Sequence, residues 1–241
     1  MRAQTALWRF YWLDVKPAIR ARRRQPQEDV ITQVLERGFR DLDVLTECVT
    51  YGAAGMVTTR ELITVGAWHL LEDPELLRRF RGGDRAERTQ ILNETLRLEP
   101  VVGHLLRRAT RATTLHGENA TVQVEPGDLV DLDLRAANAD PQAVGEEPLG
   151  LCPDRSVATG VPASAMSLGD GHHRCPGGPI GLMEAEVFLA ALFRWDIVAD
   201  GPPRVRWNPV TLGYDLDGLM LRLDQPRSAT VTTAWRGAPV A

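Results

Sequence analysis

A glycine-rich stretch around a single cysteine carries the clearest chemical potential in this sequence. It runs from Leu168 to Gly178 and reads LGDGHHRCPGG. Its glycines favour a tight, irregular turn that side chains would obstruct. Pro176 suits the first position of a helix, because it has no N–H to leave unpaired there, and an apolar helical pattern follows from Ile180. We therefore expect Cys175 at a helix N-terminus, where the dipole favours a thiolate that is either a metal ligand or a nucleophile.

The longest helical pattern contains an unusual run of small residues. Residues Leu42–Leu71 predict one helix of about 45 Å, and its middle reads AGMVTT at positions 54–59. A glycine such as Gly55 costs a helix roughly 1 kcal/mol relative to alanine. Close packing against another helix is the simplest interpretation, since small residues permit it.

A charged pair marks another predicted helix, Arg85–Leu98. Glu94 and Arg97 are three residues apart and therefore share one face of that helix. Taken alone, they would form an ordinary surface ion pair that contributes little to stability.

Shorter patterns surround these segments. Helices are expected over residues 4–24 and 28–38 and from Pro74 onward. Strands are expected over residues 113–115, 121–124, 129–134, 204–207 and 219–223, the last two on either side of Asp215–Gly218.

Composition narrows the class of protein. The chain has 241 residues and a net charge of −4, which argues against a nucleic-acid partner. Its three cysteines do not form a disulfide framework, so a reducing cytoplasm is expected. The apolar start, Leu7–Leu13, is interrupted by Arg9 and is too short for a signal peptide or a membrane span. Lys16 is the only lysine among many arginines, a bias that suggests a GC-rich bacterial genome.

Together the motifs resemble the cytochrome P450 (haem-thiolate) family. The stretch Leu-Gly-x-Gly-x-His-x-Cys-x-Gly differs from that family's haem-binding loop only in having Leu168 where the family usually has Phe. Three further motifs precede this loop in the family's order: AGMVTT, the Glu-x-x-Arg pair and Ala-Asn-x-Asp-Pro at residues 137–141. The resemblance covers about residues 25–224. It implies a mainly α fold with small β-sheets, namely the C-terminal portion of the P450 fold, and haem b as cofactor.

The resemblance also implies roles for individual residues. Cys175 would be the axial ligand of the haem iron, in a loop that includes Leu168, Gly169 and Gly177. His173 and Arg107 would pair with haem propionates, with Arg108 as a rival because the register is loose by one residue. Gly55 and Thr58 would lie on the distal helix, where a small residue admits the haem and a hydroxyl helps to hold oxygen and relay protons. Glu94 and Arg97 would lock onto Arg155 as a structural group.

Two positions depart from the family's pattern. Val57 stands where the family usually has Asp or Glu immediately before the first threonine, and valine cannot deliver a proton. Ala139 replaces the arginine of the family's Ala-Asn-Arg-Asp-Pro motif.

The start of the chain is a further anomaly, because only some forty residues precede the distal helix, where the family has helices A to F. We expect a single truncated haem-thiolate domain over residues 1–224 and a flexible tail over 225–241. Six apolar positions of the distal helix are expected to lack complete cover: Val44, Leu45, Val49, Met56, Ile63 and Trp68. A homodimer, or a complex with a partner enzyme that covers the distal face, is therefore predicted.

Three functions stay open at this point. The chain is a haem-thiolate enzyme that oxidises a small molecule in bacterial specialised metabolism with a redox partner, or a haem enzyme that uses peroxide or works without oxidation. The third is a non-catalytic partner or activator of another biosynthetic enzyme, although the retained Cys175 argues against a relative that has lost haem.

Overall fold

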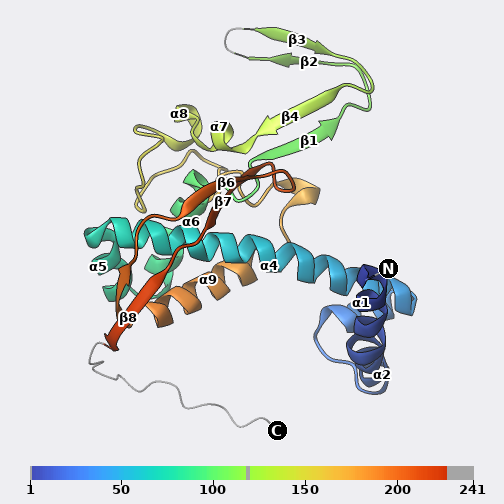
Figure 1. Cartoon of the computed structure of the whole chain (residues 1–241). Coiled ribbons are helices and arrows are strands. Elements are labelled where there is room, and N and C mark those ends of the chain that lie inside the picture. Colours follow the sequence, from blue (N-terminus) through green and yellow to red (C-terminus); the bar gives the residue numbers. More distant parts are fainter. Residues whose placement is uncertain (1, 118–119, 227–241) are drawn as a thin grey trace. The chain divides into compact units, whose positions relative to one another are not determined.

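The computed structural model describes residues 2–117 and 120–226, and the chain forms two compact units, residues 1–57 and 58–241. The boundary falls within one long helix, α4 (Asp41–Glu72), which matches the helix predicted over Leu42–Leu71. Figure 1 shows the elements of each unit. The chain is mainly helical with small sheets, as the sequence predicts.

The described residues of the first unit form helices joined by short loops. It contains α1 (Arg2–Phe10), a π-helical turn (Tyr11–Val15), α2 (Lys16–Arg24), α3 (Val30–Glu36) and the first part of α4. The predicted helix over 4–24 is therefore present, with a π-helical middle.

The core of this unit corrects one expectation. Tyr11, Val15 and Ile19 pack with Val44 and Leu45 of α4, and all five are buried. The first forty residues thus cover two of the six apolar positions that were expected to lack cover. Val49 and Met56 remain exposed.

The helical core of the second unit consists of the rest of α4, α5 (Pro74–Gly82), α6 (Arg85–Leu98) and α9 (Gly178–Leu192). Gly66 of α4 allows the close approach, because a Cβ there would lie 3.1 Å from Leu189 of α9 and 3.3 Å from Leu92 of α6. The run of small residues around Gly55, for which helix packing was the simplest interpretation, does not pack in this way, because a Cβ on Gly52 or Gly55 would meet nothing within 4 Å.

Strands in the described part of this unit form four two-stranded antiparallel sheets. β1 (His104–Arg108) pairs with β4 (Leu129–Asp133), and β2 (Thr113–His116) pairs with β3 (Thr121–Val124). β5 (Trp195–Ala199) pairs with β8 (Leu221–Pro226), and β6 (Arg204–Asn208) pairs with β7 (Gly213–Asp217). Two short helices, α7 (Leu134–Asn138) and α8 (Pro141–Val144), and a 3-10 turn (Gly171–His173) complete the fold.

Three strands differ from expectation. β1 and β5 were not predicted at all: His104–Arg108 is short and ends in two arginines, and Trp195–Ala199 is short and begins three residues after the end of α9. The acidic residues Asp215 and Asp217 were expected in a turn, but they lie in β7, where Leu216 alternates with them. The turn itself is at residues 209–212. The acidic residues are accommodated in this strand because Asp217 pairs with two arginines of β6 and Asp215 accepts a hydrogen bond from Asn208.

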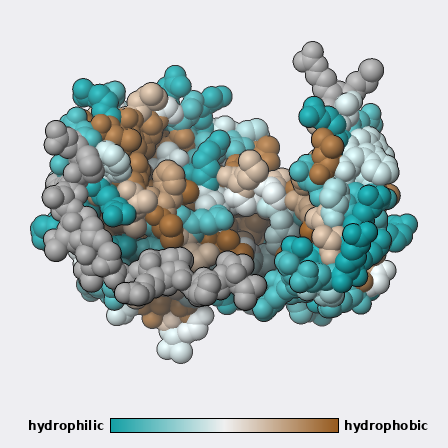
Figure 2. All heavy atoms as spheres, turned by 90° about the horizontal axis from the view of Figure 1, so that it is seen from below, coloured by the Kyte–Doolittle hydropathy of each residue, from teal (hydrophilic) through white to brown (hydrophobic). Residues whose placement is uncertain are grey.

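Apolar side chains remain exposed on α9. They are Ile180, Met183, Val187 and Phe188. Figure 2, seen from below relative to Figure 1, shows brown apolar surface interspersed with polar surface on the side where α9 lies. Among the helices that the structure describes, none has the length and apolar character needed to cross a bilayer.

Most of the predicted flexible tail, from residue 227 onward, falls outside the described residues, and Gln225 and Pro226 end β8. The single haem-thiolate domain over 1–224 stays a prediction.

Candidate functional site

The loop that carries Cys175 is closed by its own backbone. The N–H of Cys175 donates to the Leu168 carbonyl over 2.7 Å, and the N–H of His173 donates to the Asp170 carbonyl over 3.2 Å. The Cys175 thiol is free and exposed. The loop therefore presents its sulfur to the outside from a backbone that holds itself in place.

Gly169 is required by the shape of this loop. It has a φ of +69°, in the left-handed region that disfavours side chains. A Cβ at this position would lie only 2.9 Å from the carbonyl oxygen of His173. The irregular glycine turn that the sequence predicts is present.

The start of the following helix corrects the sequence-based expectation. α9 begins at Gly178 with Gly177 as its N-cap, and the proline in its first turn is Pro179. Pro176 therefore lies outside the helix, and Cys175 precedes the N-cap by two residues. The shift arises because residues 175–178 form a separate turn, in which the Gly178 N–H faces the Cys175 carbonyl at 3.4 Å.

The donor set around Cys175 fits haem iron better than a bare metal ion. Among the described residues, no group of three His, Cys, Asp or Glu side chains is arranged to hold a metal ion. A structural zinc ion needs about four protein ligands, whereas haem iron already has four ring nitrogens and needs only an axial ligand such as a thiolate. Exposed Ile180, in the first turn of α9, adds apolar surface near the loop that suits a porphyrin ring.

The threonine pair of α4 lies beside the start of α9. A Cβ on Gly181, in the first turns of α9, would lie 3.3 Å from the Thr59 hydroxyl oxygen. Thr59 thus packs against α9, while its neighbour Thr58 is half-buried on an adjacent position of α4. Gly55 lies on the part of α4 that belongs to the first unit, where its surroundings are open.

Glu94, Arg97 and Arg155 form a buried network. Arg97 donates to both carboxylate oxygens of Glu94, over 2.7 and 2.8 Å, and is completely buried. Arg155 donates to Glu94 over 2.9 Å, and the backbone N–H of Cys152 adds a bond of 3.0 Å. The structure brings together the three residues that the sequence analysis grouped, in the interior instead of on the surface.

The network sets the ionisation of its carboxylate. Burial by itself raises the pKa of Glu94, but hydrogen bonds from Arg97, Cys152 and Arg155 outweigh burial and lower the pKa below its usual value. Glu94 is therefore held as a carboxylate between two guanidinium groups.

Asn138 links this network to the cysteine loop, a role that the sequence analysis did not assign. Its side-chain amide donates to the Arg97 carbonyl over 2.9 Å and to the Ser167 hydroxyl over 2.7 Å, and its oxygen accepts from the Met166 N–H over 2.8 Å. Ser167 directly precedes Leu168. The Ala-Asn-x-Asp-Pro motif was the available signal, but nothing in it indicates which residues Asn138 would contact.

The two candidate propionate-binding arginines point to opposite faces of β1, since they are neighbours in a strand. Arg107 is half-buried and donates to the Leu106 carbonyl over 3.0 Å. Arg108 is exposed and donates to the Gly127 carbonyl over 2.5 Å. His173 is exposed at the end of the 3-10 turn. The structure separates Arg107 from Arg108, which the sequence left interchangeable.

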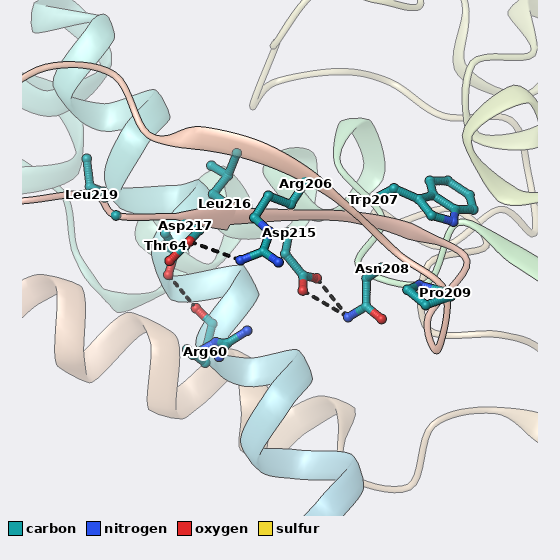
Figure 3. A pocket seen from close by; sticks show the side chains of 11 residues that line it. Arg60, Thr64, Arg206, Trp207, Asn208, Pro209, Asp215, Leu216, Asp217 and Leu219 are labelled. Carbon is teal, nitrogen blue, oxygen red and sulfur yellow. Dashed lines mark hydrogen bonds and ion pairs between the residues drawn. The ribbon is translucent and has the colours of Figure 1, made fainter.

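A pocket of about 550 Å³ lies between α4 and the β6–β7 hairpin. Figure 3 shows Arg60 and Thr64 of α4 facing strand residues that include Arg206, Asp215 and Asp217. Arg206 and Asp217 are paired at 3.4 Å, so charges of the pocket neutralise one another. None of the residues predicted for the haem site lines this pocket.

Comparison with known proteins agrees with this geometry. Residues 88–206, from α6 through the cysteine loop to β6, match the family model described as Cytochrome P450. The biotin biosynthesis cytochrome P450 of Bacillus subtilis is 32% identical over 185 residues, covering 74% of this chain and 44% of the relative. The cyclomarin C epoxidase CymV of Salinispora arenicola is 32% identical over 180 residues, covering 72% of this chain and 42% of the relative.

Solved structures show the same fold. P450BioI in complex with acyl carrier protein ligated to hexadec-9Z-enoic acid aligns with a TM-score of 0.72 and 27% identity over 87% of this chain and 52% of that chain. CYP109E1 of Bacillus megaterium in complex with corticosterone aligns with a TM-score of 0.76 and 25% identity over 92% of this chain and 58% of that chain. The chain therefore spans about half the length of the proteins it matches.

Proposed function

We propose, since the chain belongs to the cytochrome P450 family, that it binds haem b through the Cys175 thiolate and oxidises a small organic molecule. The observation that carries this proposal is the placement of Cys175. Its thiol is exposed on a loop that its own backbone closes, and Asn138 ties the residues before that loop to the buried Glu94–Arg97 pair. A thiol that is fixed and accessible in this way is suited to axial ligation.

Haem with a thiolate ligand supplies oxygen and one-electron chemistry, because the thiolate pushes electron density toward the iron. The protein's part is to hold the sulfur at one position. The bond from the Cys175 N–H to Leu168 and the left-handed Gly169 fix the loop before any ligand arrives. Preorganisation of this kind removes the cost of ordering the loop on binding. Gly177, at the N-cap of α9, lies in open space, since a Cβ there would meet nothing within 4 Å.

Cationic side chains would neutralise the propionates at the ring edge. Arg107 and His173 are the residues proposed for this role. Arg107 is favoured over Arg108, because Arg107 is half-buried on its face of β1 whereas Arg108 is exposed. A guanidinium offers two parallel donors to a carboxylate, which makes it a suitable propionate partner.

On α4, the Thr58 hydroxyl would hold and relay a proton. The hydroxyl is half-buried, which limits competition from water. Val57, the residue before Thr58, has no ionisable side chain, so it cannot deliver a proton to the Thr58 hydroxyl.

Val57 is also the observation that favours a second candidate, a haem enzyme driven by peroxide or working without oxidation. Hydrogen peroxide already carries the two electrons and two protons that must otherwise be delivered to molecular oxygen. An enzyme without an acid next to Thr58 would depend less on proton delivery in that mode.

The relatives and exposed surfaces support proposals about substrate and partners. CYP109E1 is solved with corticosterone, and P450BioI with a fatty acid carried on acyl carrier protein. A small apolar substrate and a redox partner are proposed for this chain. Exposed Met56 on α4 and Phe188 on α9 support a homodimer or a complex with a partner enzyme.

The decisive experiment is the absorption spectrum of the haem-reconstituted protein, reduced and exposed to carbon monoxide. The wild type should show the red-shifted Soret band of a thiolate-ligated haem, and Cys175→Ala should lose it. Cys152→Ala is the matched control, because Cys152 is also a free, exposed cysteine of the same unit. A wild-type protein that binds haem without this band, or a band that survives Cys175→Ala, would exclude Cys175 as the ligand.

A further inference from the structure

We propose that the β6–β7 hairpin is a brace that joins α4 to β1, and that Glu61 is the positioning residue that attaches the brace to α4. Everything in this brace belongs to the second unit. None of its anchor residues is among those proposed to contact haem or substrate.

Glu61 forms the first anchor. It lies on α4 and is buried, with only 1% of its surface exposed. One carboxylate oxygen accepts the backbone N–H of Leu216 in β7 over 3.1 Å. The other oxygen accepts from the guanidinium of Arg60, through its Nε at 2.9 Å and through a second nitrogen. A buried carboxylate is costly unless it is paired and hydrogen-bonded, so its placement against the backbone of another element indicates a specific attachment.

The pocket beside Glu61 shows why this attachment matters. A space of about 550 Å³ separates Arg60 and Thr64 from the facing residues of the hairpin. The hairpin therefore does not pack tightly along this length of α4 (Figure 3). The Glu61–Leu216 hydrogen bond holds β7 to the helix at a point contact beside open space.

Two glycines form the second anchor, at the turn of the hairpin. The Gly103 N–H donates to the Thr211 carbonyl over 3.1 Å. A Cβ on Gly103 would lie 2.2 Å from the Leu212 carbonyl oxygen, and a Cβ on Gly213 would lie 2.8 Å from the Val101 carbonyl oxygen. Backbone therefore touches backbone at a distance that only glycine allows.

The two anchors connect segments that carry proposed site residues. Glu61 is three residues after Thr58 on α4, about one helical turn away. Gly103 directly precedes β1, which carries Arg107. The brace thus sets where the Thr58 turn lies relative to β1. This part of the inference rests on the proposed function, whereas the brace itself does not.

Glu61 is assigned to positioning and not to proton transfer. Both of its carboxylate oxygens are engaged, and its side chain is shielded from solvent. A group in this state holds neighbouring elements in place without exchanging protons with a ligand.

The brace is tested by amide hydrogen exchange of residues 213–217 in the full chain without haem. Glu61→Ala should accelerate exchange about tenfold or more, since it removes a hydrogen bond to a charged group. Glu61→Gln keeps an acceptor for the Leu216 N–H and should restore slow exchange. Arg60→Gln removes the ion pair but leaves the backbone bond, so it should also keep exchange slow. Unchanged exchange in Glu61→Ala, or fast exchange in Glu61→Gln, would overturn the assignment.

A second anchor variant covers the case in which Glu61→Ala does not fold. Gly103→Ala introduces the 2.2 Å clash with Leu212 and should speed exchange in both the hairpin and β1. Slow exchange throughout in that variant would show that the glycine contact is not an anchor.

The role at the site has its own readout in haem-loaded protein. Soret shifts measure the binding of imidazole and of the bulkier 4-phenylimidazole. If the Thr58 turn is displaced, the affinity for 4-phenylimidazole should fall in Glu61→Ala but not in Glu61→Gln. The affinity for the smaller imidazole should be the same in both variants as in the wild type. If all variants bind both ligands with equal affinity while hairpin exchange is fast in Glu61→Ala, the brace is supported but its role at the site is rejected. If wild type fails to bind haem, the proposed function fails and the exchange result still decides the brace.

Discussion

Glu94 accepts a 2.9 Å hydrogen bond from Arg155, which lies 61 residues later in the chain, and both side chains are almost completely shielded from water. This contact joins α6 to the segment that leads toward the cysteine loop. It makes Glu94 the centre of a network with Arg97, Arg155 and the Cys152 backbone.

Removal of the Glu94 carboxylate is predicted to destabilise the fold strongly. Glu94→Ala leaves two buried guanidinium groups without the carboxylate that neutralises them, which should cost about 3–5 kcal/mol in the free energy of unfolding. Glu75→Ala is a matched control, because Glu75 also pairs with an arginine three residues later but is exposed. That change should cost about 0.5 kcal/mol or less. Denaturant titration measures both, and equal losses would contradict a special role for the buried network.

The same network predicts how stability responds to acid. Because the folded-state pKa of Glu94 is lowered from its usual 4.5, the folded state binds the proton less readily than the unfolded chain. The stabilisation is therefore complete above the unfolded pKa and is lost as pH falls through the lowered folded pKa. The difference in unfolding free energy between wild type and Glu94→Gln should shrink below pH 4.5. A difference that is constant across this range would show that Glu94 titrates alike in both states.

Gly169 and Gly177 should differ although both belong to the predicted haem loop. In haem-free protein, Gly169→Ala should lower thermal stability, because its φ of +69° disfavours a side chain and the new Cβ meets the His173 carbonyl. Gly177→Ala meets no atom within 4 Å and should leave stability unchanged. Selective loss of haem by Gly177→Ala would then support its proposed place at the cofactor. Equal thermal stability of the two variants would contradict the strain argument.

Arg107 and Arg108 provide a paired test of the propionate contact. Arg107→Ala should weaken haem retention by about tenfold, the size expected for one charge-assisted hydrogen bond. Arg108→Ala should have little effect, because Arg108 is exposed to solvent on the opposite face of β1. Transfer of haem to an excess of apomyoglobin measures retention. The reverse ranking would assign the contact to Arg108.

Val57 is predicted to limit oxygen-driven turnover. Val57→Asp places an acid next to Thr58 and should raise oxidation of a chromogenic phenol with oxygen and an electron donor, relative to the same reaction with hydrogen peroxide. Met56→Asp is the control, since it adds the same charge at the preceding, more exposed position. A ratio of the two activities that both variants leave unchanged would mean that proton delivery follows another route.

Much of this protein is determined by local sequence. The long helix α4, the helices α5 and α6 and the glycine turn before Cys175 follow from periodicity, capping residues and backbone preferences that act within a few residues. The cysteine loop is recognisable for the same reason, because its conformation depends on glycines within the loop and its chemistry on one side chain.

Tertiary structure decided what those elements contact. The burial of Glu94 against Arg155, the link from Asn138 to Ser167, and the attachment of Leu216 to Glu61 join residues that are far apart in sequence, so no local pattern specifies them. Asp215–Asp217 lies in a strand where the sequence predicts a turn, because its acidic residues find arginine and asparagine partners only when β6 lies beside it. The opposite orientations of Arg107 and Arg108 likewise depend on the pairing of β1 with β4.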